Sequence, residues 1–328
     1  FTQEPWNEYQ SYVNVYAIEV ISNESGADHP SLGIYKDTAL GATYDFGGVR
    51  RALFCTETQS VFNVANRIPG WDAVYIVVND TEYGGTGGYY STFSVHPDGP
   101  DVAVHENAHT FAGLADEYEG DMGGGKDSEP NIENATTLEA IKWKMWILPD
   151  TPIPTPDESL YDGLVGLFEG AKYQMTGLYR PKRNCKMREL GVAFCEVCTE
   201  THLVGSYARS IYKILDIIEG TTPSEQDFEV TLGGTSSLLF SLDTLQNESQ
   251  TVKARWYLDG VEQLGVSDTQ ISISGSQLSQ GDHWVYVIVR DRTDMIRNDP
   301  FNYRREEYYW TFKVNLVSSV APQIWNSY

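Results

Sequence analysis

The chain has 328 residues, which is enough for two domains and a sizeable buried core. Its 46 Asp and Glu residues outnumber its 23 Lys and Arg residues and give a formal net charge of −23, so the surface repels nucleic acid and anionic membranes. Ordinary apolar content, with 21 Tyr and 8 Trp, argues against disorder and for a folded protein with many β-strands or carbohydrate-rich surroundings.

No segment approaches the roughly 18 apolar residues that a membrane helix requires, so we expect no membrane span. The chain opens at Phe1 without a methionine, and we interpret it as a mature or trimmed form. Together with the acidic composition, this favours a protein that is secreted, or held at the bacterial cell surface or in the periplasm.

The N-terminal third predicts short strands and one helix. Apolar residues alternate with polar ones over Val13–Ile21 and predict a first strand. His29 lies in the loop that follows and is expected at the surface, not as a ligand. A helix is expected at Val61–Arg67, and a continuous apolar run predicts a buried strand within Trp71–Asn79.

Residues 83–97 read YGGTGGYYSTFSVHP. No Lys-Ser/Thr pair follows the glycines, so a phosphate-binding loop is disfavoured. We expect a flexible turn that leads into an edge strand at Tyr89–Val95. His96 is an alternative metal ligand, although its neighbour Pro97 and its loop setting favour a structural role.

The stretch Val102–Tyr118 contains the candidate metal-binding residues, because His105, Glu106 and His109 form an H-E-x-x-H motif. Positions i and i+4 lie on the same face of a helix, so the two imidazoles can bind one metal ion. Glu106 is then close enough to polarise a metal-bound water. Zinc with one open coordination position lowers the pKa of its water to about 7, so Zn²⁺ is the expected cofactor.

The flanking residues predict where this helix begins and ends. Asp101 is the expected N-cap, and Gly113 is expected to end the helix and let the chain turn back beneath the metal. Either Asp116 or Glu117, which follow the turn, could complete a His-His-carboxylate set. Asp116 is favoured because a short side chain on a tight turn is better fixed, and Glu117 remains a rival.

The sequence HENAHTFAGLADEY resembles the signature of the M64 metallopeptidases, a family named for bacterial IgA-cleaving peptidases. It is also similar to the metzincin pattern H-E-x-x-H-x-x-G-x-x-H/D, with the glycine and the carboxylate each one residue later. Asn107 and Ala108 differ from the residues usual in the family but leave the ligands and the base intact. The resemblance covers most of residues 1–220. It implies a metzincin-like α/β zinc peptidase domain whose edge strand holds an extended protein or peptide substrate.

Two further segments follow the motif. Residues 119–165 are rich in Gly, Asp, Glu and Pro and predict loops around a short helical segment, Thr136–Trp146, that wall a cleft. The resemblance also implies that Met187, in a Cys-x-Met element, packs beneath the metal as support and not as a ligand.

The four cysteines are Cys55, Cys185, Cys195 and Cys198. The C-x-x-C pair suggests zinc or redox chemistry, but a structural zinc would need two more soft ligands. Disulfides suit an exported protein at least as well. We expect that Cys185 and one cysteine of the C-x-x-C pair clip the site region together.

The last part of the chain predicts a second domain. Apolar residues at helical spacing predict a helix at Thr199–Glu219, and residues 221–224 are interpreted as a linker. About six or seven short alternating strands are expected to follow, and they indicate an immunoglobulin-like β-sandwich with a hairpin turn at Asp259-Gly260. Six of them are placed near Phe228, Phe240, Trp256, Ile271, Val287 and Trp310. The expected domains are therefore a peptidase domain, residues 1–220, and an all-β sandwich, residues 221–328.

The leading functional hypothesis is a zinc endopeptidase in which His105, His109 and Asp116 bind the metal and Glu106 is the general base. Host glycoproteins such as IgA are candidate substrates, although the family name does not establish them. One alternative is a glycan- or protein-binding surface protein with an idle peptidase fold, which the intact Glu106 argues against. Another is an amidase that acts on cell-wall peptides.

Overall fold

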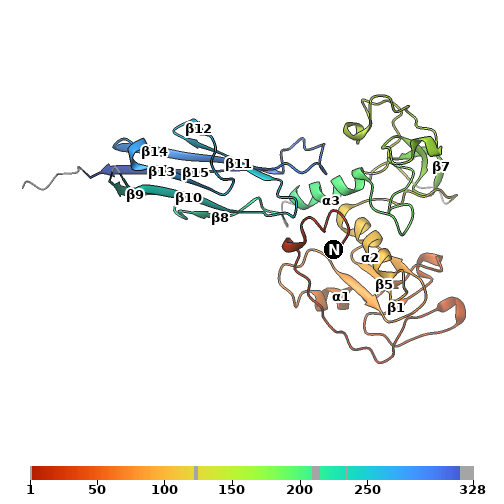
Figure 1. The fold of residues 1–328 in the computed structure, drawn as a ribbon. Coiled ribbons are helices and arrows are strands. Elements are labelled where there is room, and N and C mark those ends of the chain that lie inside the picture. Colours follow the sequence, from red (N-terminus) through yellow and green to blue (C-terminus); the bar gives the residue numbers. More distant parts are fainter. Residues whose placement is uncertain (1, 122–124, 209–214, 234, 318–328) are drawn as a thin grey trace, which may run out of the picture. The chain divides into compact units, whose positions relative to one another are not determined.

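The computed structural model describes residues 2–121, 125–208, 215–233 and 235–317 (Figure 1). The chain forms two compact units. The N-terminal unit contains Phe1–Ile214 and Met295–Asn298, and the C-terminal unit contains Leu215–Asp294 and Asp299–Tyr328. Within the described residues, no helix has the length and hydrophobicity that a membrane span requires.

The N-terminal unit combines short helices with short strands. Its α-helices in the described residues are α1 (Thr58–Ala65), α2 (Gly99–Asn107) and α3 (Glu196–Ala208), and its single-turn 3-10 helices are Gln10–Tyr12, Pro30–Leu32, Phe46–Gly48, Lys144–Trp146 and Ser159–Tyr161. Its strands are β1 (Ala42–Thr43), β2 (Phe54–Cys55), β3 (Tyr75–Val78), β4 (Gly85–Thr86), β5 (Ser91–Ser94), β6 (Phe168–Ala171) and β7 (Gln174–Arg180).

A three-stranded sheet of order β3-β5-β4 supports helix α2. Strand β5 pairs in parallel with β3 and antiparallel with β4, and α2 packs against β5 (Figure 1). An added Cβ at Gly85 would collide with the side chain of Val102, so a glycine is needed where β4 approaches α2. The other two sheets of this unit are the antiparallel pairs β1-β2 and β6-β7.

The prediction of an edge strand at Tyr89–Val95 was wrong, because β5 is the central strand of its sheet. The edge strand beside α2 is β4, which the glycine-rich segment itself forms. The buried strand expected within Trp71–Asn79 is β3, but only one of its faces is buried, and Val77 is 60% exposed. An edge position with one covered face explains this alternation.

Two other predictions for this unit were wrong. The described segment Val13–Ile21 contains no strand, and Ile21 is 93% exposed, so its apolar alternation does not correspond to a sheet face. In Thr136–Trp146 only the 3-10 turn Lys144–Trp146 is helical. The helix predicted at Val61–Arg67 is α1, which begins and ends earlier.

The C-terminal unit is built from two sheets, which Figure 1 shows as two layers. Their orders are β13-β10-β8 and β12-β11-β14-β15-β9, and all pairings are antiparallel except β15 with β9. The strands are β8 (Ile218–Thr222), β9 (Asp227–Leu232), β10 (Ser237–Thr244), β11 (Val252–Leu258), β12 (Val261–Gln263), β13 (Gln270–Ser274), β14 (Gly281–Asp291) and β15 (Arg305–Leu316), with a 3-10 turn at Gly275–Gln277.

Aromatic side chains join the two sheets. Phe240 on β10 lies with its ring centroid 5.1 Å from that of Trp310 on β15, and Trp310 stacks on Trp256 of β11 at 6.1 Å. All three side chains are fully buried. Because aromatic rings bury large apolar areas, this cluster supplies the unit with a core of its own.

All six strands predicted in this region are present, and Asp259 and Gly260 form the predicted hairpin turn with φ of 50° and 84°. The sequence missed β8 and β12. The helix predicted at Thr199–Glu219 is α3, which begins at Glu196, while Ile218 and Glu219 belong to β8. Residues 209–214 of that prediction lie outside the described residues. Residues 221 and 222 of the predicted linker also belong to β8.

The aromatic core gives a stability prediction for the C-terminal unit. Phe240→Ala should lower the free energy of unfolding by about 3–5 kcal/mol, because it removes a fully buried ring between the sheets. Leu239→Ala, on the same strand, should change it by no more than about 0.5 kcal/mol, since Leu239 is 47% exposed. Chemical denaturation measures both variants. Equal losses would contradict this assignment of the inner face.

Candidate metal centre

Helix α2 brings the H-E-x-x-H residues together. It begins at Gly99, directly after its N-cap Asp98, with Pro100 in its first turn. The prediction that Asp101 is the N-cap was therefore wrong. Asp101 lies inside the first turn, where its carboxylate forms an ion pair with Lys186 and accepts a hydrogen bond from the Gly191 N–H.

The helix continues through a π-helical turn, Ala108–Ala112, and ends at Gly113 as predicted. Gly113 adopts a left-handed conformation with φ of 67°, and the N–H of Leu114 donates to the carbonyl oxygen of Ala108 at 3.1 Å. This reversal directs residues 114–117 back towards the histidines. It also places the carbonyl oxygen of Leu114 2.7 Å from Nδ1 of His109.

His105, His109 and Asp116 converge after this turn. Oδ1 of Asp116 lies 3.1 Å from Nε2 of His105 and 3.3 Å from Nε2 of His109, and the two Nε2 atoms are 3.2 Å apart. The donor atoms all lie within 4.8 Å of one another. Two imidazole nitrogens and one carboxylate oxygen suit a zinc ion that keeps a fourth position open, so the residues fit the expected cofactor.

Backbone carbonyl groups set the orientation of both imidazoles. Nδ1 of His105 lies 2.8 Å from the carbonyl oxygen of Lys186, and Nδ1 of His109 has a similar partner in Leu114. Because a carbonyl oxygen only accepts, each Nδ1 carries the proton and each Nε2 is left to bind a metal.

In the absence of a metal, the charges of His109 and Asp116 shift each other's pKa. Burial alone would lower the pKa of His109, but the hydrogen bond and the charge of Asp116 raise it to about 9. Burial would raise the pKa of Asp116, yet both histidines hold it well below its usual range. Metal binding must therefore displace a proton from His109, which makes the metal affinity depend on pH.

The side chains of Asp116 and Glu117 contact two different groups of residues. Asp116 lies with the histidines, whereas Glu117 is fully buried, with its Oε1 atom 3.2 Å from Sγ of Cys198 and 3.0 Å from Nδ2 of Asn131. Metal binding by Asp116 stays a prediction, but only this carboxylate of the pair is placed for it. His96 is not in the group, and its Nδ1 accepts the N–H of Asp98 at 3.2 Å.

His29 likewise lies outside the group, but the prediction that it is a surface residue was wrong. It is 8% exposed, stacks on Tyr44 and has Nε2 3.0 Å from a carboxylate oxygen of Asp80.

Glu106 is the remaining residue of the motif and is only 6% exposed. Burial raises the pKa of its carboxyl group. The chain after β4 passes very close to it, because an added Cβ at Gly87 would lie 3.3 Å from Oε2 of Glu106 and 2.8 Å from its backbone oxygen. A glycine is therefore needed between the edge strand and this carboxylate.

Tyr173 is a site residue that sequence reasoning missed. Its hydroxyl donates to Oδ2 of Asp116 at 2.6 Å, and it lies 2.7 Å from the hydroxyl of Tyr118, which accepts from Nη2 of Arg51 at 3.0 Å. Tyr173 and Lys172 form the two-residue turn of the β6-β7 hairpin, both with positive φ. Lys-Tyr is not a pair that commonly forms such a turn, so the local sequence did not predict this hairpin.

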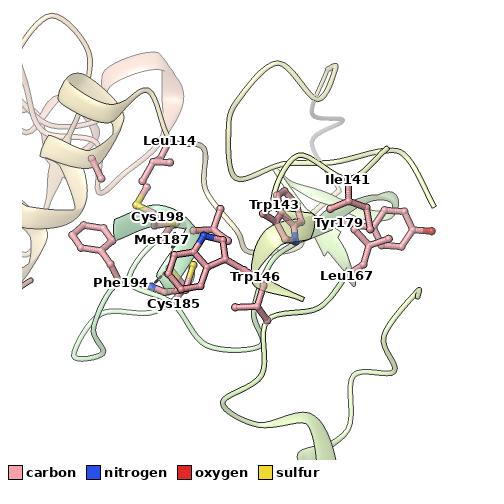
Figure 2. Close-up of a cluster of buried hydrophobic side chains, with 14 residues drawn as sticks. Leu114, Ile141, Trp143, Trp146, Leu167, Tyr179, Cys185, Met187, Phe194 and Cys198 are labelled. Carbon is pink, nitrogen blue, oxygen red and sulfur yellow. Dashed lines mark hydrogen bonds between the residues drawn. The ribbon is translucent and has the colours of Figure 1, made fainter. Parts of the chain in front are cut away.

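The turn Cys185–Met187 lies beside this group. The carbonyl oxygen of Lys186 holds His105, and that of Met187 accepts the N–H of Glu117 at 2.8 Å. Met187 is fully buried in one core cluster with Leu114, Cys185 and Cys198 (Figure 2). It is not part of the metal-binding group, and its buried position agrees with a supporting role.

Comparisons with known proteins give one informative match. A family model described as IgA Peptidase M64 matches residues 1–161 and 157–203, more than half of the chain. No curated protein matches. Among solved structures, an endo-β-1,4-mannanase from Thermotoga petrophila is 11% identical with a TM-score of 0.22, covering 45% of this chain and 28% of that chain. A likeness this weak carries no argument about fold or function.

The tyrosine contact predicts an effect on metal affinity. Tyr173→Phe should weaken metal binding by about 10- to 100-fold, because it removes the hydrogen bond that orients Asp116. Tyr118→Phe is the control, since it leaves that bond in place and should have a smaller effect. Competition with a chromogenic chelator measures the affinity, with His109→Ala as the baseline that lacks this site. Unchanged affinity in Tyr173→Phe would refute the role.

Proposed function

The chain belongs to the IgA peptidase M64 family, and from this premise we propose that it is a zinc-dependent endopeptidase that hydrolyses protein substrates. The observation that supports zinc dependence is the convergence of donor atoms from His105, His109 and Asp116 within 4.8 Å, with Glu106 buried on the same helix. These four side chains match the roles of three metal ligands and one base.

Each residue has a distinct task in this mechanism. Zinc held by the three ligands would supply Lewis acidity that activates the attacking water and polarises the scissile carbonyl group. Glu106 accepts the proton of that water and later delivers it to the leaving amine. Burial raises the pKa of Glu106, which suits a group that both takes and returns a proton. Tyr173 keeps Asp116 in its orientation throughout.

The substrate backbone could bind along the chain that leaves β4. Strand β4 itself pairs with β5, and its Gly85 N–H already donates to the carbonyl oxygen of Arg51 at 3.2 Å. The chain continues from β4 to Gly87, which lies beside Glu106. We propose that an extended peptide binds along this glycine segment and that its scissile bond is thereby presented to Glu106.

We extend the proposal to the fold of each unit. A metzincin-like domain is supported by the left-handed Gly113 after the H-E-x-x-H helix and by the buried Met187. An immunoglobulin-like sandwich is supported by the two sheets and aromatic core of the C-terminal unit. We further propose a bacterial protein that is secreted, or retained at the cell surface or in the periplasm. The net charge of −23 supports this location, and the family name supports host glycoproteins such as IgA as candidate substrates.

A second candidate function is glycan binding by the C-terminal unit. A groove of about 550 Å³ is lined by residues of β9, β14 and β15, and Trp284 provides a ring on the same face of the sheet as Asp282 and Lys313. Trp284 is 41% exposed, and an exposed ring flanked by polar groups suits a sugar face. Binding on a glycan array without cleavage of any protein would favour this function over the peptidase. An amidase of cell-wall peptides would instead cleave muropeptides and no protein.

Substitution of the proposed general base, Glu106, tests the peptidase mechanism. Glu106→Gln should lower kcat for a cleaved protein substrate by at least about 10²–10⁴-fold while the metal content stays unchanged, because the ligands are intact. His109→Ala should lose both activity and the metal of this site. A Glu106→Gln variant with full metal and full activity would exclude Glu106 as the base.

A further inference from the structure

A second group of metal-binding side chains lies outside the site described above. Cys185, Cys195, Cys198 and Glu117 place their sulfur and oxygen atoms within 4.8 Å of one another. None of the four side chains is more than 2% exposed. The peptidase mechanism uses none of them, so their convergence needs another explanation.

The distances fit ligands that share one ion. Sγ of Cys185 lies 3.6 Å from Sγ of Cys198, which in turn lies 3.2 Å from Oε1 of Glu117. Tetrahedral zinc with bonds of about 2.3 Å to sulfur separates two sulfur ligands by about 3.8 Å. A disulfide would bring the sulfur atoms to about 2.05 Å. All four cysteines of the chain are free, so the expectation that Cys185 forms a disulfide with Cys195 or Cys198 was wrong.

Glu117 provides an independent indication of a missing partner. Its Oε1 accepts a hydrogen bond from Asn131, but its Oε2 is buried and has no hydrogen-bond partner among the described residues. A buried carboxylate oxygen without a partner is unfavourable. A cation bound between this carboxylate and the sulfur atoms would satisfy it.

Local structure explains how the sulfur atoms meet. Cys195 directly precedes α3 and Cys198 lies in its first turn, where a spacing of three residues puts both side chains on one side. Cys185 approaches from the turn that contains Met187, and its Sγ accepts the N–H of Cys195 at 3.3 Å. Figure 2 shows Cys185 and Cys198 within the core cluster, close to Met187 and Phe194. Water is therefore excluded from this group.

We propose that Cys185, Cys195, Cys198 and Glu117 bind a structural zinc ion, distinct from the ion of the His105 group. Three sulfur ligands and one carboxylate oxygen complete a tetrahedral shell with no position left for water or substrate, so this ion is structural and not catalytic. Thiolates favour zinc over Mg²⁺ and Ca²⁺, which prefer oxygen ligands. Binding releases the thiol protons and involves no redox change.

The structural zinc would also support the catalytic group. Glu117 directly follows Asp116, so one peptide unit joins a ligand of each ion. Cys185 directly precedes Lys186, whose carbonyl oxygen orients His105. Loss of the structural ion should therefore weaken metal binding by the His105 group, whereas loss of the catalytic ion should leave the structural ion in place.

Metal analysis of the full chain tests this proposal. Protein purified without chelator should contain two zinc ions per chain by mass spectrometry, and His109→Ala should retain one. Cys195→Ser should lose the structural ion, whereas Cys55→Ser, which changes a buried cysteine outside the group, should retain both. With cobalt in place of zinc, His109→Ala should show a thiolate-to-cobalt charge-transfer band that Cys195→Ser lacks. This optical signal does not depend on peptidase activity.

A second measurement covers the case in which Cys195→Ser does not fold. An organomercurial that reacts with thiols should release one zinc ion from His109→Ala, and denatured protein without reductant should show four reactive thiols. A disulfide among Cys185, Cys195 and Cys198, or a His109→Ala variant without zinc, would overturn the proposal. Iron in place of zinc would overturn the identity of the ion. An inactive wild-type enzyme that still holds the thiolate-bound zinc would contradict only the proposed peptidase function.

Discussion

The short segment that follows Gly113 is the constraint on which the candidate centre depends. The carbonyl oxygen of Leu114 orients His109, and the side-chain amide of Asn131 bonds both the N–H and the carbonyl oxygen of Ala115 at 2.9 and 2.8 Å. Asp116 then faces the histidines and Glu117 faces the cysteines. This segment is fixed by backbone hydrogen bonds on both sides, so it can present two neighbouring carboxylates to two different groups.

Buried charge is the main energetic problem of this region. Glu106 and Glu117 are buried and the side chain of Asp116 is only 11% exposed, and an uncompensated carboxylate in such surroundings is strongly unfavourable. Asp116 is compensated by the histidines, whereas burial raises the pKa of Glu106 and Glu117 towards the neutral form. A cation in each group would remove this cost. Metal binding and folding of the N-terminal unit should therefore be coupled.

The turn Cys185–Met187 connects the His105 group with the cysteine group. Lys186 has a fully buried side chain that forms an ion pair with Asp101 in the first turn of α2, while its carbonyl oxygen holds His105. The Met187 carbonyl oxygen binds the Glu117 N–H. Three successive residues thus contact α2, the carboxylate segment and the cysteine group. Rigid support of this kind keeps metal ligands in their geometry and explains why a turn remote in sequence matters to the site.

Features that depend on local spacing follow from the sequence: His105 and His109 on one helix face, the helix end at Gly113, and the alternating strands of the C-terminal unit. Sequence-based prediction failed where the structure of a segment depends on which other segment it pairs with, as for the strand predicted at the exposed segment Val13–Ile21. Only the tertiary structure could bring Tyr173 to Asp116 and the cysteines to Glu117, across separations of 57 and 81 residues. Periodicity encodes which face of an element is buried, but it carries no information on which distant side chains will meet there.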